Sequence, residues 1–89
     1  MKAVVTVVGK DQVGIIARVC TGLAEYQVNV LDISQTVMQG YFTMMMVVDV
    51  AEANLPLAKI CQQMDAKGQE MGLSIRIQRE DIFEAMHRV

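Results

Sequence analysis

The 89-residue chain has no tryptophan, only two tyrosines and two phenylalanines, and no excess of basic charge. Eight Lys and Arg residues stand against ten Asp and Glu residues, and the formal net charge is −2. Proteins that bind nucleic acid usually present a basic surface, and RNA-binding sheets stack bases on aromatic side chains. Tyr41 and Phe42 are the only aromatic residues in a strand-like segment. This composition argues against a nucleic-acid partner.

Cysteine and histidine are also scarce. Cys20 and Cys61 lie far apart and form no CxxC pair, and His87 is the only histidine. Structural and catalytic metal sites need several such ligands at close spacing, and a lone histidine completes no Cys/His or Ser/His/Asp set. We therefore predict no metal, no cofactor and no catalysis. Both cysteines fall on apolar helix faces, which predicts buried, unreactive thiols.

Long hydrophobic runs are missing. A membrane-spanning helix needs about 18 or more apolar residues, whereas the longest apolar run covers residues 42–48 and is interrupted by Thr43. The sequence shows no basic-then-apolar signal segment. We therefore expect a cytoplasmic protein with free thiols and no membrane partner.

Aliphatic residues and methionine are abundant instead. Hydrophobic residues make up 53% of the chain and include eight methionines, which is typical of a folded domain. The length allows one domain, over residues 1–89. A domain of this size buries a modest share of its surface, so we expect a second copy of the chain to supplement the core.

The hydrophobic pattern switches between the periods of strands and helices along the chain. The expected elements, in order, are a strand at 2–8, a helix at 15–26, a hairpin at 28–50 that turns at Gln39-Gly40, a helix at 56–71, a strand at 73–78 and a short helix from 81. The order β-α-β-β-α-β predicts an α+β fold, the ferredoxin-like sandwich. In it, two right-handed crossovers interleave into a four-stranded antiparallel sheet with two helices on one face.

The strand expected at 41–50 is apolar on both faces. Met44, Met46 and Val48 share one face, and Met45 and Val47 share the other. Two helices on one side of the sheet would leave the second set facing water. We therefore expect the extra C-terminal helix to cover the open face of the sheet, in its own monomer or in a partner.

Local signals refine these elements. Val30 and Leu31 break the alternation of their strand, which predicts a β-bulge or a twisted edge. Asn54 is expected to cap the helix that starts near Pro56, and Gly72 to end it. Ser34, Gln35 and Thr36 follow in mid-strand, where they either face solvent on an edge strand, line a dimer seam or contact a ligand.

The segment GKDQVG, residues 9–14, joins the first strand to the first helix. Asp11 is placed to cap that helix, whose first N–H groups have no intrahelical acceptor and attract a carboxylate or a phosphate. An acid beside such donors suits a free amino acid. The same residues also fit a plain turn and a cap. A nucleotide-binding loop has no support, because Ile15 and Ile16 stand where Lys and Ser/Thr belong.

The stretch GKDQVGIIARVCTGLAEYQVNVLDIS resembles the opening half of the ACT domain, a small ligand-sensing module of amino-acid metabolism. The signature is an Asp, two residues, a Gly and an aliphatic residue at the helix start, with an Asn-aliphatic pair opening the second strand. The matching positions are Asp11, Gly14, Ile15, Asn29 and Val30. The segments DISQTV, YFTMMMVV and DIFEAMHRV are similar to the stand-alone bacterial and archaeal ACT proteins. Val13 stands where the family often has Pro, which leaves the turn less rigid.

The resemblance implies a regulatory protein that binds an amino acid between two domains. The ligand-binding residues expected on this basis are Asp11, Gln12, Gly14, Ile15, Asn29 and Val30. The Gly14 and Ile15 amides would hold the carboxylate, and Asp11 the ammonium group. A helix of about 13 residues is roughly 20 Å long, so Asn29 must come from a second copy. We therefore predict a homodimer through the second strands, which are edges of their sheets.

Three alternatives stay open at this stage. The first is an interaction or structural protein of ACT fold without a small-molecule ligand. The second is an acylphosphatase-type enzyme, which needs an arginine in the loop after the first strand, where this chain has only Lys10. The third is RNA binding by the sheet. The sequence does not identify the ligand, a protein partner or any assembly beyond the dimer.

Overall fold

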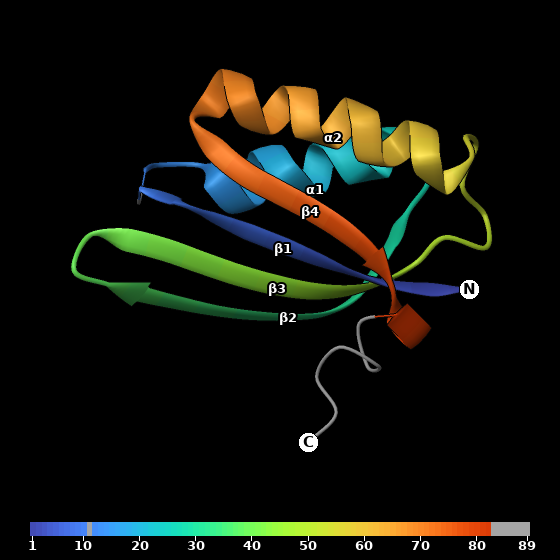
Figure 1. Cartoon of the computed structure of the whole chain (residues 1–89), viewed down its shortest axis with the longest axis horizontal. Helices are drawn as coiled ribbons and strands as arrows, with labels where there is room; N and C mark the ends of the chain where they lie inside the picture. Colours follow the sequence, from blue (N-terminus) through green and yellow to red (C-terminus); the bar gives the residue numbers. More distant parts are fainter. Residues whose placement is uncertain (11, 83–89) are drawn as a thin grey trace.

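The computed structural model describes residues 1–10 and 12–82. Its elements are β1 (Lys2–Lys10), α1 (Ile15–Glu25), β2 (Asn29–Met38), β3 (Tyr41–Asp49), α2 (Leu57–Met71) and β4 (Leu73–Arg79). The four strands form one antiparallel sheet in the order β2-β3-β1-β4. Both helices lie on one face of that sheet (Figure 1). The predicted ferredoxin-like architecture is therefore confirmed.

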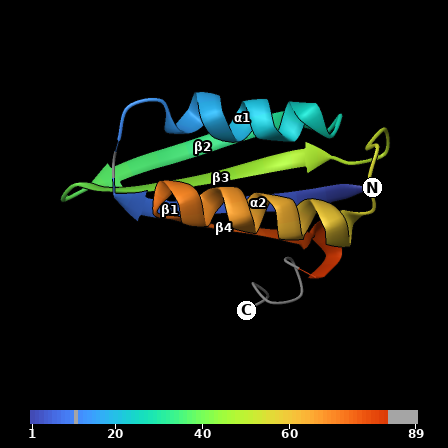
Figure 2. The ribbon, with the colours of Figure 1, turned by 90° about the horizontal axis from the view of Figure 1, so that it is seen from above.

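The core lies between the sheet and the two helices. Strand β1 is central and pairs with β3 and β4, so that Val5 stands opposite Met46 and Ile77. Viewed from above, α1 and α2 run side by side, with α2 on the β4 side (Figure 2). The fully buried side chains of this layer are Val5, Val7, Val19, Leu23, Met44, Met46, Val48, Ile60 and Met64. Three methionines are thus among the side chains that fill the centre of the core.

The first strand is longer than the sequence pattern predicted. Gly9 and Lys10 belong to β1, and Gly9 pairs with Phe42 on one side and Leu73 on the other. A Cβ atom at Gly9 would lie 2.5 Å from Leu73 Cδ2 and 3.2 Å from the Gly72 carbonyl oxygen. Gly9 therefore permits the close approach of β4 and is not the turn residue that its place in the sequence indicated.

The β2–β3 hairpin follows the prediction closely. Its register shifts between Val30 and Asp32, which leaves Leu31 as the extra residue of a bulge, as expected. The turn residues Gln39 and Gly40 both have positive φ, 52° and 80°. Such backbone angles suit a tight hairpin whose twist matches its strands.

The predicted cap of α2 is wrong. Pro56 occupies the N-cap position of α2, and no side chain caps the helix. Asn54 binds α1 instead: its Nδ2 donates to the Glu25 carbonyl oxygen at 3.1 Å, and its backbone N–H donates to the Tyr26 carbonyl oxygen at 3.0 Å. These bonds satisfy carbonyl oxygens at the C-terminus of α1, which have no N–H donor within the helix. Gly72 ends α2 in the left-handed region, with φ of 71°, as predicted.

The chain leaves the end of β4 in a helical turn over residues 80–82, away from α1 and α2 (Figure 1). This turn begins one residue before the predicted helix start. The rest of the predicted terminal helix, and His87 with it, lies outside the described residues.

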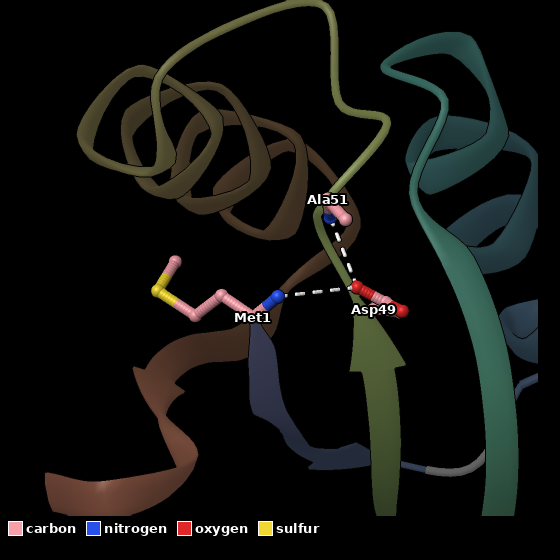
Figure 3. A network of polar contacts seen from close by, with 3 residues as sticks. All are labelled: Met1, Asp49 and Ala51. Atoms are coloured by element: carbon pink, nitrogen blue, oxygen red, sulfur yellow. Dashed lines mark hydrogen bonds and ion pairs between the residues drawn. The ribbon is translucent and has the colours of Figure 1, made fainter.

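The amino group of Met1 lies at the end of β3 (Figure 3). Asp49 Oδ1 lies 3.5 Å from the Met1 ammonium group and accepts the backbone N–H of Ala51 at 2.9 Å. The Val50 N–H donates to the Met1 carbonyl oxygen at 2.9 Å. The hydrogen bond from Ala51 is the main cause that lowers the pKa of Asp49 below its usual value of 3.8, and the ammonium group and Lys2 add to it.

Gly68 in α2 should resist substitution although alanine favours helices. A Cβ atom there would lie 2.9 Å from the Leu73 carbonyl oxygen and 3.0 Å from Ile75 Cγ1. We expect Gly68→Ala to lower the free energy of unfolding in urea by about 1–3 kcal/mol. Gly22→Ala in α1 is the matched control, because its Cβ would meet the flexible ends of Met64 and Lys67 at 3.3 and 3.4 Å. The control should be neutral or up to about 1 kcal/mol more stable. Equal stability of Gly68→Ala and wild type would contradict the close helix–sheet packing.

The Asp49 contacts predict a pH dependence of stability. A carboxyl group whose pKa is lowered by folding stabilises the native state above its unfolded pKa, and this contribution is lost as pH falls through the folded pKa. The Asp49→Asn variant should therefore melt below wild type near neutral pH. The difference in Tm should shrink as pH falls below about 4. The effect should be modest because the carboxylate is at the surface. A Tm difference that stays constant across this range would show that the charge of Asp49 has no role.

Candidate functional site

The start of α1 offers free backbone amides. Gly14 occupies the N-cap position with φ of 85°, and its carbonyl oxygen accepts the Arg18 N–H at 3.0 Å. The N–H groups of Ile15, Ile16 and Ala17 come before Arg18, the first residue whose N–H donates along the helix, and none of the three has an acceptor among the described residues. A Cβ atom at Gly14 would meet nothing within 4 Å. The amides and the positive end of the helix dipole are therefore accessible to a small anion.

An open pocket of about 570 Å³ lies beside these amides. The first turn of α1 forms one wall, and the helix-facing side of the β2–β3 hairpin forms the other. The residues around it are Gln12, Gly14, Ile15, Ile16, Ala17, Gln35, Val37 and Phe42. Among the described residues, no charged side chain lines the pocket, and the polar groups there are backbone amides and two glutamine amides. A pocket with apolar walls and a few polar groups is the usual form of a small-molecule site.

Three of the six predicted site residues line this pocket. Gly14 and Ile15 contribute the helix start, and Gln12 contributes the loop before it. The Gln12 Nε2 donates to the Met71 carbonyl oxygen at 2.9 Å, which ties this loop to the end of α2. Asp11, the predicted partner of an ammonium group, lies outside the described residues.

Asn29 and Val30 do not line the pocket of their own chain. They open β2, whereas the pocket lies beside Gln35 and Val37 further along that strand. Asn29 is exposed and stands opposite Asp49 in the sheet register. A strand rises about 3.3 Å per residue, so about 20 Å separates Asn29 from Gln35. One chain therefore does not bring the two halves of the predicted site together.

Among the pocket residues that the sequence reasoning missed are two from the β2–β3 hairpin. Val37 and Phe42 stand opposite each other in the β2–β3 register and form the wall that faces α1. The predicted turn at Gln39-Gly40 already implies that Val37 and Phe42 pair with each other. The sequence did not indicate that this end of the hairpin lies beside the start of α1. For Gln35 the sequence left three positions open: in solvent, at a dimer seam or beside a ligand. In the structure it lines the pocket.

The edge strand β2 is exposed along its length. Every residue of β2 is exposed except Val30, which is half-buried. Its exposed fractions reach 55% at Val37 and 68% at Met38, and 41% at Ile33. An edge with free backbone groups and apolar side chains is a ready template for pairing with another strand. It adjoins the pocket through Gln35 and Val37.

The described residues offer little other chemistry. Both cysteines are free and half-buried, so the prediction that they are core residues holds only in part. Burial raises the pKa of the Cys61 thiol, which donates to the Ile77 carbonyl oxygen at 3.6 Å. Such a thiol is a poor nucleophile near neutral pH. Across residues 1–10 and 12–82, no three His, Cys, Asp or Glu side chains are grouped to hold a metal ion. No helix in this part of the chain is long and apolar enough to cross a membrane.

Comparison with known proteins gives consistent matches. A UPF0237 protein of Bifidobacterium longum is 54% identical over 88 residues, which cover 99% of this chain and 98% of that protein. An ACT domain protein from Streptococcus pneumoniae has a solved structure with a TM-score of 0.83, 46% identity and 98% coverage of each chain. The regulatory subunit of aspartate kinase from Thermus thermophilus gives a TM-score of 0.68 at 26% identity, over 89% of this chain and 51% of that one.

A family model also matches most of the chain. The model of the ACT domain matches residues 2–78, which include both helices and all of the four strands except the last residue of β4, Arg79. Its range contains every residue of the candidate site. Together with the full-length likeness to the Streptococcus pneumoniae protein, it shows that this chain belongs to the ACT domain family.

Proposed function

We propose that the protein is a regulatory module that binds an amino acid at a homodimer interface and has no catalysis of its own. Membership in the ACT family, and the likeness to a regulatory subunit of aspartate kinase, support a regulatory ligand-binding module. The observation that carries the proposal is the open pocket beside the unpaired amides of Ile15, Ile16 and Ala17.

The pocket suits the carboxylate end of an amino acid. In the proposed complex, the amides at the start of α1 donate to the carboxylate, and the helix dipole adds a favourable field. Gly14 leaves space for this approach because it has no side chain. Asp11 supplies the counter-charge for the ammonium group. The ligand side chain then lies against Val37 and Phe42.

The proposed dimer completes the site through the β2 edge. In this dimer, a two-fold axis passes near Ser34, in the middle of β2 (Asn29–Met38), and the two β2 strands pair antiparallel. The helices of both copies then cover the same face of the joined sheet. This pairing brings the first residues of the partner subunit's β2 beside Val37 and Met38. Asn29 of the partner subunit then lies at this pocket, although Asn29 does not reach the pocket of its own chain.

A second function fits the same surface. The exposed apolar side chains of β2 also suit an interaction protein of ACT fold without a small-molecule ligand. Both functions require β2 to pair, and only the first requires the pocket to be occupied. A ligand measurement therefore separates them.

A thermal-shift screen against the twenty amino acids tests the ligand. A ligand at 100 times its Kd that binds only the native state stabilises it by about 2.7 kcal/mol, so one or a few amino acids should raise Tm by several degrees. The variants Asp11→Asn and Asn29→Ala should lose most of this shift. Gln63→Ala, an exposed position on α2, is the control and should keep it. If none of the twenty raises Tm, the ligand-free interaction protein is the better description.

Mass measurement in solution tests the interface. Wild type should have twice the 9.9 kDa mass of one chain at micromolar concentration. The double variant Ile33→Lys/Gln35→Lys should be monomeric, because its lysines face one another across the two-fold axis. Ser74→Lys, an exposed position on the opposite edge strand β4, should stay dimeric. A wild type that is monomeric, or a double variant that still dimerises, would exclude this interface.

A further inference from the structure

Helix α1 turns its charged residues toward α2. Arg18 and Glu25 border the groove between the two helices, and Glu25 Oε2 lies 3.0 Å from Lys67 Nζ. A Cβ atom at Gly22 would meet Met64 and Lys67 of α2, so Gly22 marks the side of α1 that faces α2. Both charged residues of α1 lie on this side. The opposite side of the helix therefore carries no charge.

Three residues share that opposite side. They follow one another at intervals of one helical turn and are Ile16, Cys20 and Ala24. Ile16 and Cys20 are half-buried against the core, whereas Ala24 is exposed. We call this row the α1 ridge. It lies on the β2 side of the helix layer, because α2 covers the β4 side (Figure 2).

The β2 strand leaves apolar side chains open beside the α1 ridge. Ile33 and Val37 stand opposite buried core residues of β3, so they point to the helix side of the sheet. They are nevertheless 41% and 55% exposed. Ile16 borders the pocket together with Val37. The α1 ridge and the helix side of β2 therefore form one open apolar surface.

Pairing of the β2 strands does not by itself cover enough area for a stable dimer. The ten residues of β2 span about 33 Å, and a sheet is about 10 Å thick, so the strand edge covers roughly 330 Å². A stable interface covers about 800 Å² per partner. The proposed dimer therefore needs a further contact, and the open apolar surface is continuous with the β2 edge.

The α1 ridge lies where a two-fold axis through the middle of β2 requires it. Ile16 borders the pocket beside Gln35 and Val37. Helix α1 runs antiparallel to β2 (Figure 2). Cys20 is one helical turn after Ile16, about 6 Å, which corresponds to about two residues of β2 and places Cys20 above Ser34. The axis proposed near Ser34 therefore also passes near the middle of the α1 ridge.

We propose that the α1 ridges of two copies pack antiparallel across the two-fold axis that pairs their β2 strands. This packing presupposes the β2 dimer of the proposed function and adds the helix layer to it. Cys20 then faces Cys20 of the partner subunit. Ile16 meets Ala24 of the partner subunit, so that a large side chain packs against a small one. The positive end of each helix dipole lies beside the negative end of the other.

The helix contact extends the pocket to the second copy. Ile16 borders the pocket, and the last turn of the partner's α1 lies beside Ile16 in the proposed packing. A ligand held by the amides at the start of α1 therefore touches both copies. Binding of the ligand and packing of the helices then strengthen each other, since coupling between two equilibria is reciprocal.

A charge on the α1 ridge tests the helix contact. Ala24→Lys should raise the dissociation constant of the dimer by about tenfold or more, because it sets an ammonium group against Ile16 of the partner subunit. The fold of the single chain should be unaffected, since Ala24 is exposed. Thr21→Lys is the matched control, because Thr21 is exposed on the same helix and lies outside the ridge, beside the α1–α2 groove. Its dissociation constant should stay within about twofold of wild type.

Analytical ultracentrifugation of the full chain measures these constants. A wild-type dimer that Ala24→Lys leaves unchanged, or that both variants weaken equally, would overturn the helix contact and leave the β2 interface in place. A wild type that is monomeric would overturn both.

The native cysteines give a second readout. In the Cys61→Ala variant, diamide should oxidise Cys20 of the two copies to one disulfide, with the two electrons and two protons passing to the diamide. The product is a covalent dimer on a non-reducing gel. Cys20→Ala is the matched control, because it keeps the half-buried Cys61 and should run as a single chain. A disulfide needs Cα atoms about 4–7 Å apart, which identical residues reach only near the axis. A dimeric protein that forms no Cys20 disulfide, or equal cross-linking in the control, would overturn the proposed packing.

Discussion

The central position of β1 is the constraint on which the rest of this structure depends. It pairs with β3 on one side and with β4 on the other, so Val5 and Val7 are buried in the core between the sheet and the two helices. Gly9 allows β4 to approach at the end of this strand, where a Cβ atom would collide with Leu73. With β1 in the centre, the start of α1 lies at that same end of the sheet, next to the turn of the β2–β3 hairpin. The candidate pocket is a consequence of this arrangement.

The same arrangement explains why one chain does not bring all the predicted site residues together. Helix α1 runs back along the sheet, so the residues that follow it, Asn29 and Val30, open β2 at the opposite end from Gly14. The helix therefore separates the two halves of the family's sequence signature by its own length. The proposed two-fold axis across β2 would bring the two halves together, because antiparallel pairing places the beginning of one strand beside the end of the other. An edge strand that is exposed along its length is consistent with that arrangement.

Much of the fold followed from hydrophobic periodicity and from a few turn residues. Gln39, Gly40 and Gly72 end their elements where expected, and all three have positive φ. Glycine adopts such angles without strain, so the chain turns at these residues whatever their neighbours are. The bulge at Leu31 was predictable because the alternation of apolar and polar residues breaks there. Without an extra residue, every later side chain of β2 would point to the opposite face of the sheet. Asn54 was misassigned since its amide has several possible acceptors near in space. The carbonyl oxygen that it binds belongs to Glu25, on a different helix.

The sequence by itself determined the order of the elements, the family, and the half of the candidate pocket that lies within a few residues: Gly14, Ile15 and the amides of the first helical turn. These features depend on local backbone geometry, which a short stretch of sequence encodes. Only the tertiary structure decided that Val37 and Phe42 form the opposite wall, that Gly9 serves packing, and that Gln12 is bonded to the end of α2. Those contacts join residues that are distant in the chain, and they exist only once strand order and register bring the segments together.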